Sequence, residues 1–156
     1  MIAEGAGVNR NFGLAWLALS LTLCVHVLDE DLTGFLPLYN ATVSAMKAKY
    51  TWYPMPIFTF REWLFGLIAV CVILLLLTPF AFRNATALRP LAYFFATVMF
   101  LNGMGHTLAT IFGRTVSTVP VPRPAPGFYS SPLLLFFSAL LFSRLLASRK
   151  RSGVSQ

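Results

Sequence analysis

The sequence contains few charged residues, and acidic residues are especially scarce. Charged residues occupy 11% of its 156 positions, five residues are Asp or Glu, and 57% of the chain is hydrophobic. A soluble domain usually carries about 25% charged residues. This composition therefore excludes an ordinary soluble protein and predicts an integral membrane protein, with residues 1–156 forming a single membrane domain.

Cysteine and histidine are also scarce, with two of each. Cys24 and Cys71 both lie in apolar runs, where packed thiols are expected instead of a disulfide. The net charge of +7 does not indicate nucleic-acid binding, because four of the twelve basic residues are Arg144 and the members of a basic tail at 148–156. A basic cluster just after a membrane span is typical of an anchor facing lipid headgroups.

Four segments are apolar and long enough to be membrane helices, since a helix needs roughly 20 residues to cross the hydrocarbon core. We expect helices at about 12–30, 63–82, 91–112 and 131–147, the last being short for a span. They predict an all-α fold, an integral membrane four-helix bundle with up-and-down topology. Pro79 is expected to kink or end the second helix.

The connection between the first two helices is long and rich in aromatic residues. Residues 32–60 include Trp52 and several tyrosines and phenylalanines. Because Trp and Tyr prefer the headgroup region, we expect a loop that lies on the bilayer or folds over the mouth of the bundle.

Basic residues in the loops predict the orientation of the chain. Seven Lys and Arg residues fall on the side of the two termini, and five fall on the other side. This bias favours cytoplasmic N- and C-termini, in a plasma or inner membrane.

The two histidines stand near the ends of two apolar segments. The segment His26–Glu30 reads HVLDE and ends the first helix, and Asn102–His106 reads NGMGH within the third. In an up-and-down bundle the first and third helices end at the same face. His26 is two residues from the end of its apolar segment and His106 is six, or about 9 Å at 1.5 Å per residue. We therefore expect the two histidines to share a site.

The residue types at this site indicate metal binding. His26, Asp29 and Glu30 share a helix face by their spacing, and imidazole with carboxylate is a usual ligand set for zinc or non-haem iron. The predicted ligands are His26, Asp29, Glu30 and His106. Asp29 or Glu30 is alternatively a general base, with Asn102 orienting a ligand or the substrate. An intramembrane ionisable residue is by default a functional candidate.

These residues leave several functions open. The first is a metal-dependent membrane enzyme, a hydrolase or oxidoreductase acting on a small lipophilic molecule. The second is an electron-transfer protein with haem b between two axial histidines, in which the carboxylates have no role. The third is an accessory subunit without chemistry, whose candidate partners are a second copy of the chain or a larger membrane complex. Glu62, which follows Arg61, is expected only to cap the second helix.

The order of these motifs resembles that of the HXXEE family of small four-helix membrane proteins. That family combines His-x-x-Glu-Glu at the end of the first helix, Asn-x-x-x-His in the third, and Tyr-x-Pro-Gly before the fourth. Here Asp29 replaces the first Glu, the Asn102–His106 motif is complete, and Pro126–Gly127 retains the last two residues of the third motif. The tyrosine is missing, with Tyr129 close by. The resemblance implies a metal-binding membrane protein without naming a reaction.

Overall fold

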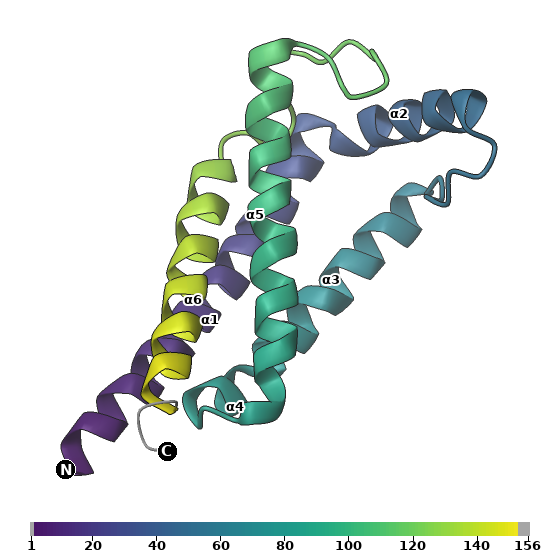
Figure 1. Ribbon diagram of the computed structural model, residues 1–156. Helices are drawn as coiled ribbons and strands as arrows, with labels where there is room; N and C mark the ends of the chain where they lie inside the picture. Colours follow the sequence, from purple (N-terminus) through teal and green to yellow (C-terminus); the bar gives the residue numbers. More distant parts are fainter. Residues whose placement is uncertain (1, 153–156) are drawn as a thin grey trace.

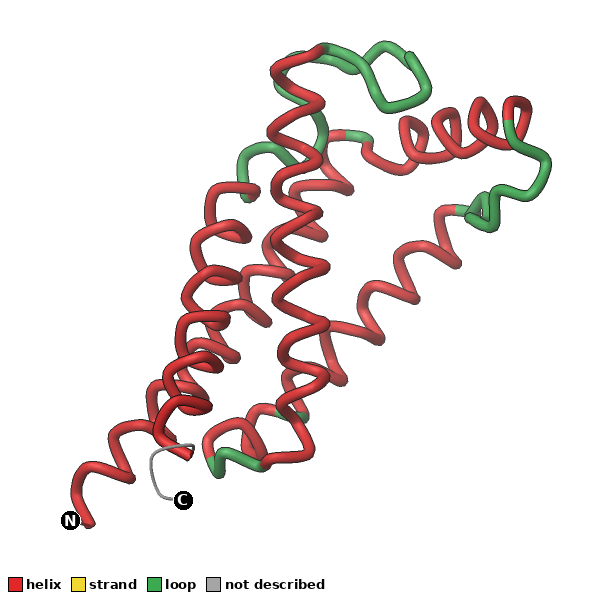
Figure 2. Tube along the Cα trace, viewed as in Figure 1, coloured by secondary structure: helices red, strands yellow, loops and turns green. Residues whose placement is uncertain are grey.

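The computed structural model describes the backbone of residues 2–152 and the side chains of residues 10–147. Apart from short turns, the described chain is helical, and its two longer loops are 50–59 and 113–130 (Figure 2). The elements are α1 (Ile2–Thr33), α2 (Phe35–Lys49), α3 (Phe60–Leu76), α4 (Thr78–Phe82), a 3₁₀ turn (Thr86–Leu88), α5 (Arg89–Phe112) and α6 (Ser131–Ser152). This confirms the all-α class. The side chains of the predicted basic tail 148–156 lie outside the described residues.

Among the described residues, three helical stretches are long and apolar enough to cross a membrane. They are Arg10–Thr33, Phe60–Phe82 and Thr86–Phe112, while Ser131–Ala147 is apolar but shorter. Figure 1 shows α1, α5 and α6 side by side, with α3 leaning away at its N-terminal end. Because α3 packs along α1 and makes no broad contact with α5 or α6, these contacts do not amount to a closed four-helix bundle.

The prediction of a long loop at 32–60 is wrong for residues 35–49, which form α2. Gly34 has a φ of 80° and separates α2 from α1, a left-handed conformation that glycine adopts without strain. Pro37 is the third residue of α2, where the backbone N–H that proline lacks would have had no partner in the helix. The loop that follows packs back on α2, since the amide of Asn40 both donates to and accepts from the backbone of Phe58.

The positions at which α3 begins and ends are explained by the residues at each end. Thr59 and Glu62 form a capping box in which the Thr59 hydroxyl accepts from the Glu62 N–H and the Glu62 carboxylate accepts from the Thr59 N–H. This confirms Glu62 as a cap. The helix ends at Leu76, and Pro79 lies in the first turn of the short α4, so the predicted interruption at Pro79 is also confirmed.

The buried side chains of α1 and α5 form stripes along one face of each helix. On α1 the stripe recurs every three or four residues and its larger members are Phe12, Trp16, Leu19, Leu23, His26, Val27 and Glu30. On α5 the stripe runs through Ala92, Phe95, Met99, Gly103 and His106. At Gly103 a Cβ would lie 3.0 Å from the Ser131 carbonyl oxygen, so glycine here permits the close approach of α5 and α6. Both histidines thus point into the same core.

Candidate metal centre

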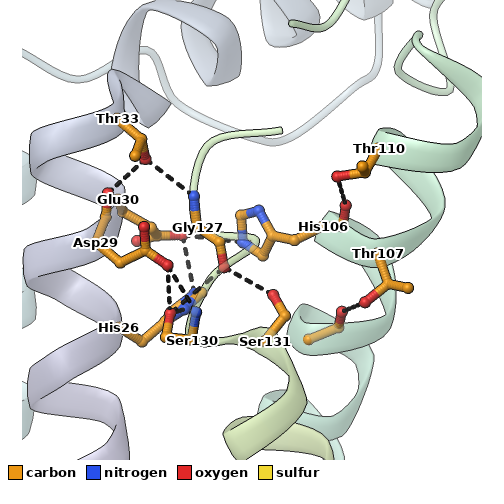
Figure 3. Close-up of polar contacts among 11 residues, drawn as sticks. His26, Asp29, Glu30, Thr33, His106, Thr107, Thr110, Gly127, Ser130 and Ser131 are labelled. Carbon is orange, nitrogen blue, oxygen red and sulfur yellow. Dashed lines mark hydrogen bonds and ion pairs between the residues drawn. The ribbon is translucent and has the colours of Figure 1, made fainter. Parts of the chain in front are cut away.

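His26, Glu30 and His106 converge on one point in the core (Figure 3). The Oε1 atom of Glu30 lies 3.3 Å from Nε2 of His26 and 3.2 Å from Nε2 of His106. The exposed fractions of the three side chains, in the order His26, Glu30 and His106, are 0%, 5% and 7%. One ligand atom from each residue lies within 4.8 Å of the others, which is a separation that a single metal ion can bridge.

Two helices supply these side chains. His26 and Glu30 are one turn apart in the last two turns of α1, so their side chains leave the helix on the same side. His106 lies six residues before the end of α5. The two imidazoles lie close together, as their predicted common depth requires. Their ring centroids are 4.9 Å apart and their planes form an angle of 70°.

Asp29 lies beside this group and is bonded to Ser130, at the loop end just before α6. The Asp29 carboxylate oxygen Oδ2 accepts from the backbone N–H of Ser130 at 2.8 Å and from its hydroxyl at 2.7 Å. The same hydroxyl oxygen lies 2.7 Å from Nδ1 of His26. The single hydroxyl proton of Ser130 is assigned to this carboxylate, because the other acceptor, the Gly127 carbonyl oxygen, is farther away at 3.4 Å. His26 then donates from Nδ1 to Ser130.

This hydrogen-bond pattern determines which nitrogen of His26 is free. With its proton on Nδ1, a neutral His26 presents the lone pair of Nε2 to the carboxylate of Glu30, and this buried Nε2 has no hydrogen-bond partner. Two lone-pair atoms that face each other at this distance need a positive charge between them, either a proton or a metal ion. Buried polar atoms without a hydrogen-bond partner are rare in proteins. The unpartnered Nε2 of His26 is therefore suited to be a metal ligand.

The connection between α5 and α6 closes the site at Gly127. A Cβ on this residue would lie 2.8 Å from Cε1 of His106 and 3.0 Å from Cε1 of His26, and its φ is +77°. Its N–H donates to the hydroxyl of Thr33 at 3.0 Å, and its carbonyl accepts from the hydroxyl of Ser131 at 2.7 Å (Figure 3). Glycine is required here both for the backbone conformation and for the space.

An open cavity of about 600 Å³ borders the site on the side of His106 and is lined by α2, α5 and the loop after α5. Asn102 lines this cavity one turn from His106, so it lies apart from the three converging side chains. Tyr39 of α2 is another lining residue. Burial and the neighbouring Tyr53 raise the pKa of Tyr39, and its neutral hydroxyl donates to the carbonyl of Pro56 at 3.1 Å.

The structure thus brings together three of the four predicted ligands, His26, Glu30 and His106. The fourth, Asp29, lies next to them and is hydrogen-bonded to Ser130. The sequence reasoning missed Ser130, Gly127 and Thr33. Only Gly127 carried a signal, as part of the Pro-Gly pair before the last helix. Hydroxyl residues such as Ser130 and Thr33 occur throughout the chain, and no spacing singles them out.

Comparison of the chain with models of protein families, with curated proteins and with solved structures finds no match. The functional assignment therefore depends on the geometry of the site.

Proposed function

We propose that this protein is a metal-dependent membrane enzyme whose divalent ion is held by His26, Glu30 and His106. The observation that carries the proposal is the meeting of two Nε2 atoms and one carboxylate oxygen in a buried core, with Nε2 of His26 lacking any hydrogen-bond partner. A buried carboxylate near two neutral imidazoles is unfavourable without a compensating positive charge.

The donor set also fits catalysis. Two histidines and one carboxylate are the ligands of catalytic zinc in many hydrolases and of non-haem iron(II) in many oxygenases, and both kinds of site keep open positions. When bound, such an ion supplies Lewis-acid chemistry if it is zinc and redox chemistry if it is iron. The reaction class, hydrolysis or oxidation, follows from the metal.

Asp29 and Asn102 take supporting roles in this proposal. Metal-ligating histidines usually donate their second N–H to an oxygen that fixes the ring, often a carboxylate, and here Ser130 transmits that effect from Asp29 to His26. Asp29 is therefore left out of the ligand set. Asn102 faces the adjoining cavity, where it contacts a small lipophilic substrate.

We propose that the chain lies in the lipid bilayer of a plasma or inner membrane. Three apolar helices support this, with α6 as a shorter fourth crossing in an up-and-down arrangement and both termini in the cytoplasm. We further propose that the chain is a divergent member of the HXXEE family. What supports this is that His26 and Glu30, His106, and Gly127, which come from the three motif segments, all meet at one site.

The geometry does not favour haem b. A porphyrin would have to lie between the two imidazoles, where the carboxylate of Glu30 stands 3.2 and 3.3 Å from their Nε2 atoms. A purely structural subunit, alone or in a larger complex, does not require two histidines and a carboxylate to converge in a buried core.

Elemental analysis of the purified protein tests the proposal. We expect about one zinc or iron ion per chain, an absorption spectrum without a haem band, and loss of the ion in Glu30→Gln and in the His26→Ala, His106→Ala double variant. Glu62→Gln, which alters only the cap of α3, is the matched control and should retain the ion. Equal metal content in wild type and Glu30→Gln, with both proteins helical by circular dichroism, would refute the proposal.

A further inference from the structure

The cavity beside His106 has the properties of a binding site for an amphiphile. Its volume, about 600 Å³, lies within the usual range of small-molecule sites, about 300–1,000 Å³. Apolar and aromatic side chains form most of its walls, and they come from α2 and α5: Phe35, Leu38 and Tyr39 on one side, and Leu108, Ala109 and Phe112 on the other.

Polar side chains line the cavity on α5 and on the loop that follows it, and Tyr39 and Thr42 add two more from α2. His106 and Asn102 lie at the inner end, on α5. Arg114, Thr115 and Thr118 lie at the outer end, on the loop that follows α5. His106 lies six residues before the end of α5, which corresponds to about 9 Å at 1.5 Å per residue, and Arg114 follows two residues after that end.

Arg114 carries a positive charge without an acidic partner. Within residues 10–147, no acidic side chain lies within ion-pair distance of Arg114, since the close contacts of basic groups with carboxylates join Glu30 to His26 and His106, and Arg114 itself is exposed. It lies two residues after Phe112, where the apolar span ends. A basic residue at this level faces lipid headgroups and attracts anionic ones.

The apolar wall of the cavity is reached from the side of the helices. Leu108 is 42% exposed and Phe112 is 62% exposed, although both line the cavity. In a bilayer these two side chains would face hydrocarbon, so an acyl chain could reach the cavity along α5 without crossing water.

We propose that this cavity binds a single-chain amphiphile with an anionic headgroup. The headgroup pairs with Arg114 at the outer end, and the apolar chain lies along α5 past His106 towards Asn102. The inference deepens the proposed function by naming its substrate class, and it rests on that function only in placing the chain beside the metal centre.

Photolabelling tests this proposal on the full chain in phospholipid nanodiscs. The probe is a 16-carbon fatty acid with a photoreactive group in its chain, and the comparison probe is the alcohol of the same chain. We expect the acid to label cavity residues of α2 and α5 several-fold more than the alcohol does. Unlabelled hexadecanoate and hexadecyl phosphate should compete, and the stronger competitor identifies the headgroup as carboxylate or phosphate.

Two matched pairs of variants locate the site. At Gly105 and at Gly66 an added Cβ would meet nothing within 4 Å, but only Gly105 lines the cavity. Gly105→Leu should therefore reduce cavity labelling several-fold, and Gly66→Leu should leave it unchanged. Arg114→Gln should remove the preference for the acid over the alcohol, whereas Arg61→Gln, at an exposed position on α3, should preserve it.

The outcomes separate this proposal from the metal proposal because labelling is repeated after chelation and metal content is measured on the same samples. Cavity labelling that persists in protein without metal supports the amphiphile site even if the metal proposal fails. Equal labelling by acid and alcohol, or equal labelling in wild type and Gly105→Leu, overturns the amphiphile site whatever the metal content.

Discussion

The Nδ1 atom of His26 lies 2.7 Å from the Oγ atom of Ser130, although the two residues are 104 positions apart. Because this hydroxyl donates to Asp29, it can only accept from His26, and the contact determines which imidazole nitrogen faces Glu30. In the proposed metal site, the role of His26 as a ligand would therefore depend on Ser130, which lies just before the last helix.

Ser130→Ala should weaken metal binding without unfolding the protein. Removing the hydroxyl leaves the His26 ring without its acceptor, so the tautomer with the proton on Nδ1 is no longer favoured. Loss of a group that orients a ligand typically lowers metal affinity 10–100-fold. Competition with a chelator of known affinity measures this loss, and nitrogen NMR of labelled histidine reports the tautomer directly.

The control is Ser143→Ala, which removes an exposed hydroxyl bonded within its own helix. Ser130→Thr retains a hydroxyl and should restore the wild-type tautomer. If Ser130→Ala leaves both the nitrogen spectrum and the affinity unchanged, Ser130 does not orient His26.

Asp29→Ala should have a similar effect, whereas Asp31→Ala should not. Asp29 accepts from both the backbone N–H and the hydroxyl of Ser130, while the neighbouring Asp31 is exposed and its backbone carbonyl accepts from Gly34. We expect metal affinity to fall about 10–100-fold in Asp29→Ala alone. A complete loss of the ion would instead indicate that Asp29 is itself a ligand, as the spacing of the motif predicts.

Gly127→Ala should abolish metal binding. The new methyl group would stand against both imidazoles, and the left-handed backbone adds strain that destabilises the fold by more than about 1 kcal/mol. Gly34→Ala is the control for strain, since Gly34 has a similar φ of +80° but open space around it. Metal retained in Gly127→Ala would show that the loop is not held against the histidines. Metal lost in Gly34→Ala would show that strain alone removes it.

Removing the metal should lower the thermal stability of the wild-type protein. A ligand that binds only the folded state stabilises it by about 2.7 kcal/mol at a concentration 100 times its Kd. A thermal scan in detergent, with and without chelator, should show a lower unfolding temperature after chelation. The His26→Ala, His106→Ala double variant should unfold at one temperature under both conditions, and a shift of equal size in this variant would mean that the chelator acts elsewhere.

Reporters fused to the two termini should show the same sidedness in the membrane. Both ends lie on one side only if an even number of segments crosses, which requires the short α6 to cross as the fourth. Opposite sides would mean that α6, whose apolar part is Ser131–Ala147, does not span the bilayer.

The sequence predicts the helical class and most of the site because both depend on local spacing. His26 and Glu30 lie one turn apart, and the apolar length of α5 sets the depth of His106. Pro79 and Glu62 act through their immediate neighbours, so their effects on α3 were also predictable.

The remaining features depend on contacts between distant segments. Nothing local to Ser130 indicates that it accepts from His26. The aromatic residues of α2 suggested a loop at the bilayer surface, whereas Phe35 packs its ring 5.3 Å from that of His106. The position of α3, which leans away from α5, is set by tertiary packing that hydrophobic periodicity does not encode.

The distribution of the site along the chain affects the order of biosynthesis. His26 and Glu30 leave the ribosome early, but His106 follows only with α5, and Ser130 emerges after that helix is complete. The group formed by His26, Glu30 and His106 therefore cannot close before α5 has been made, and His26 is not oriented until Ser130 has been added. Stable retention of an ion would then mark a fully inserted chain, and truncated products that lack α6 would release it.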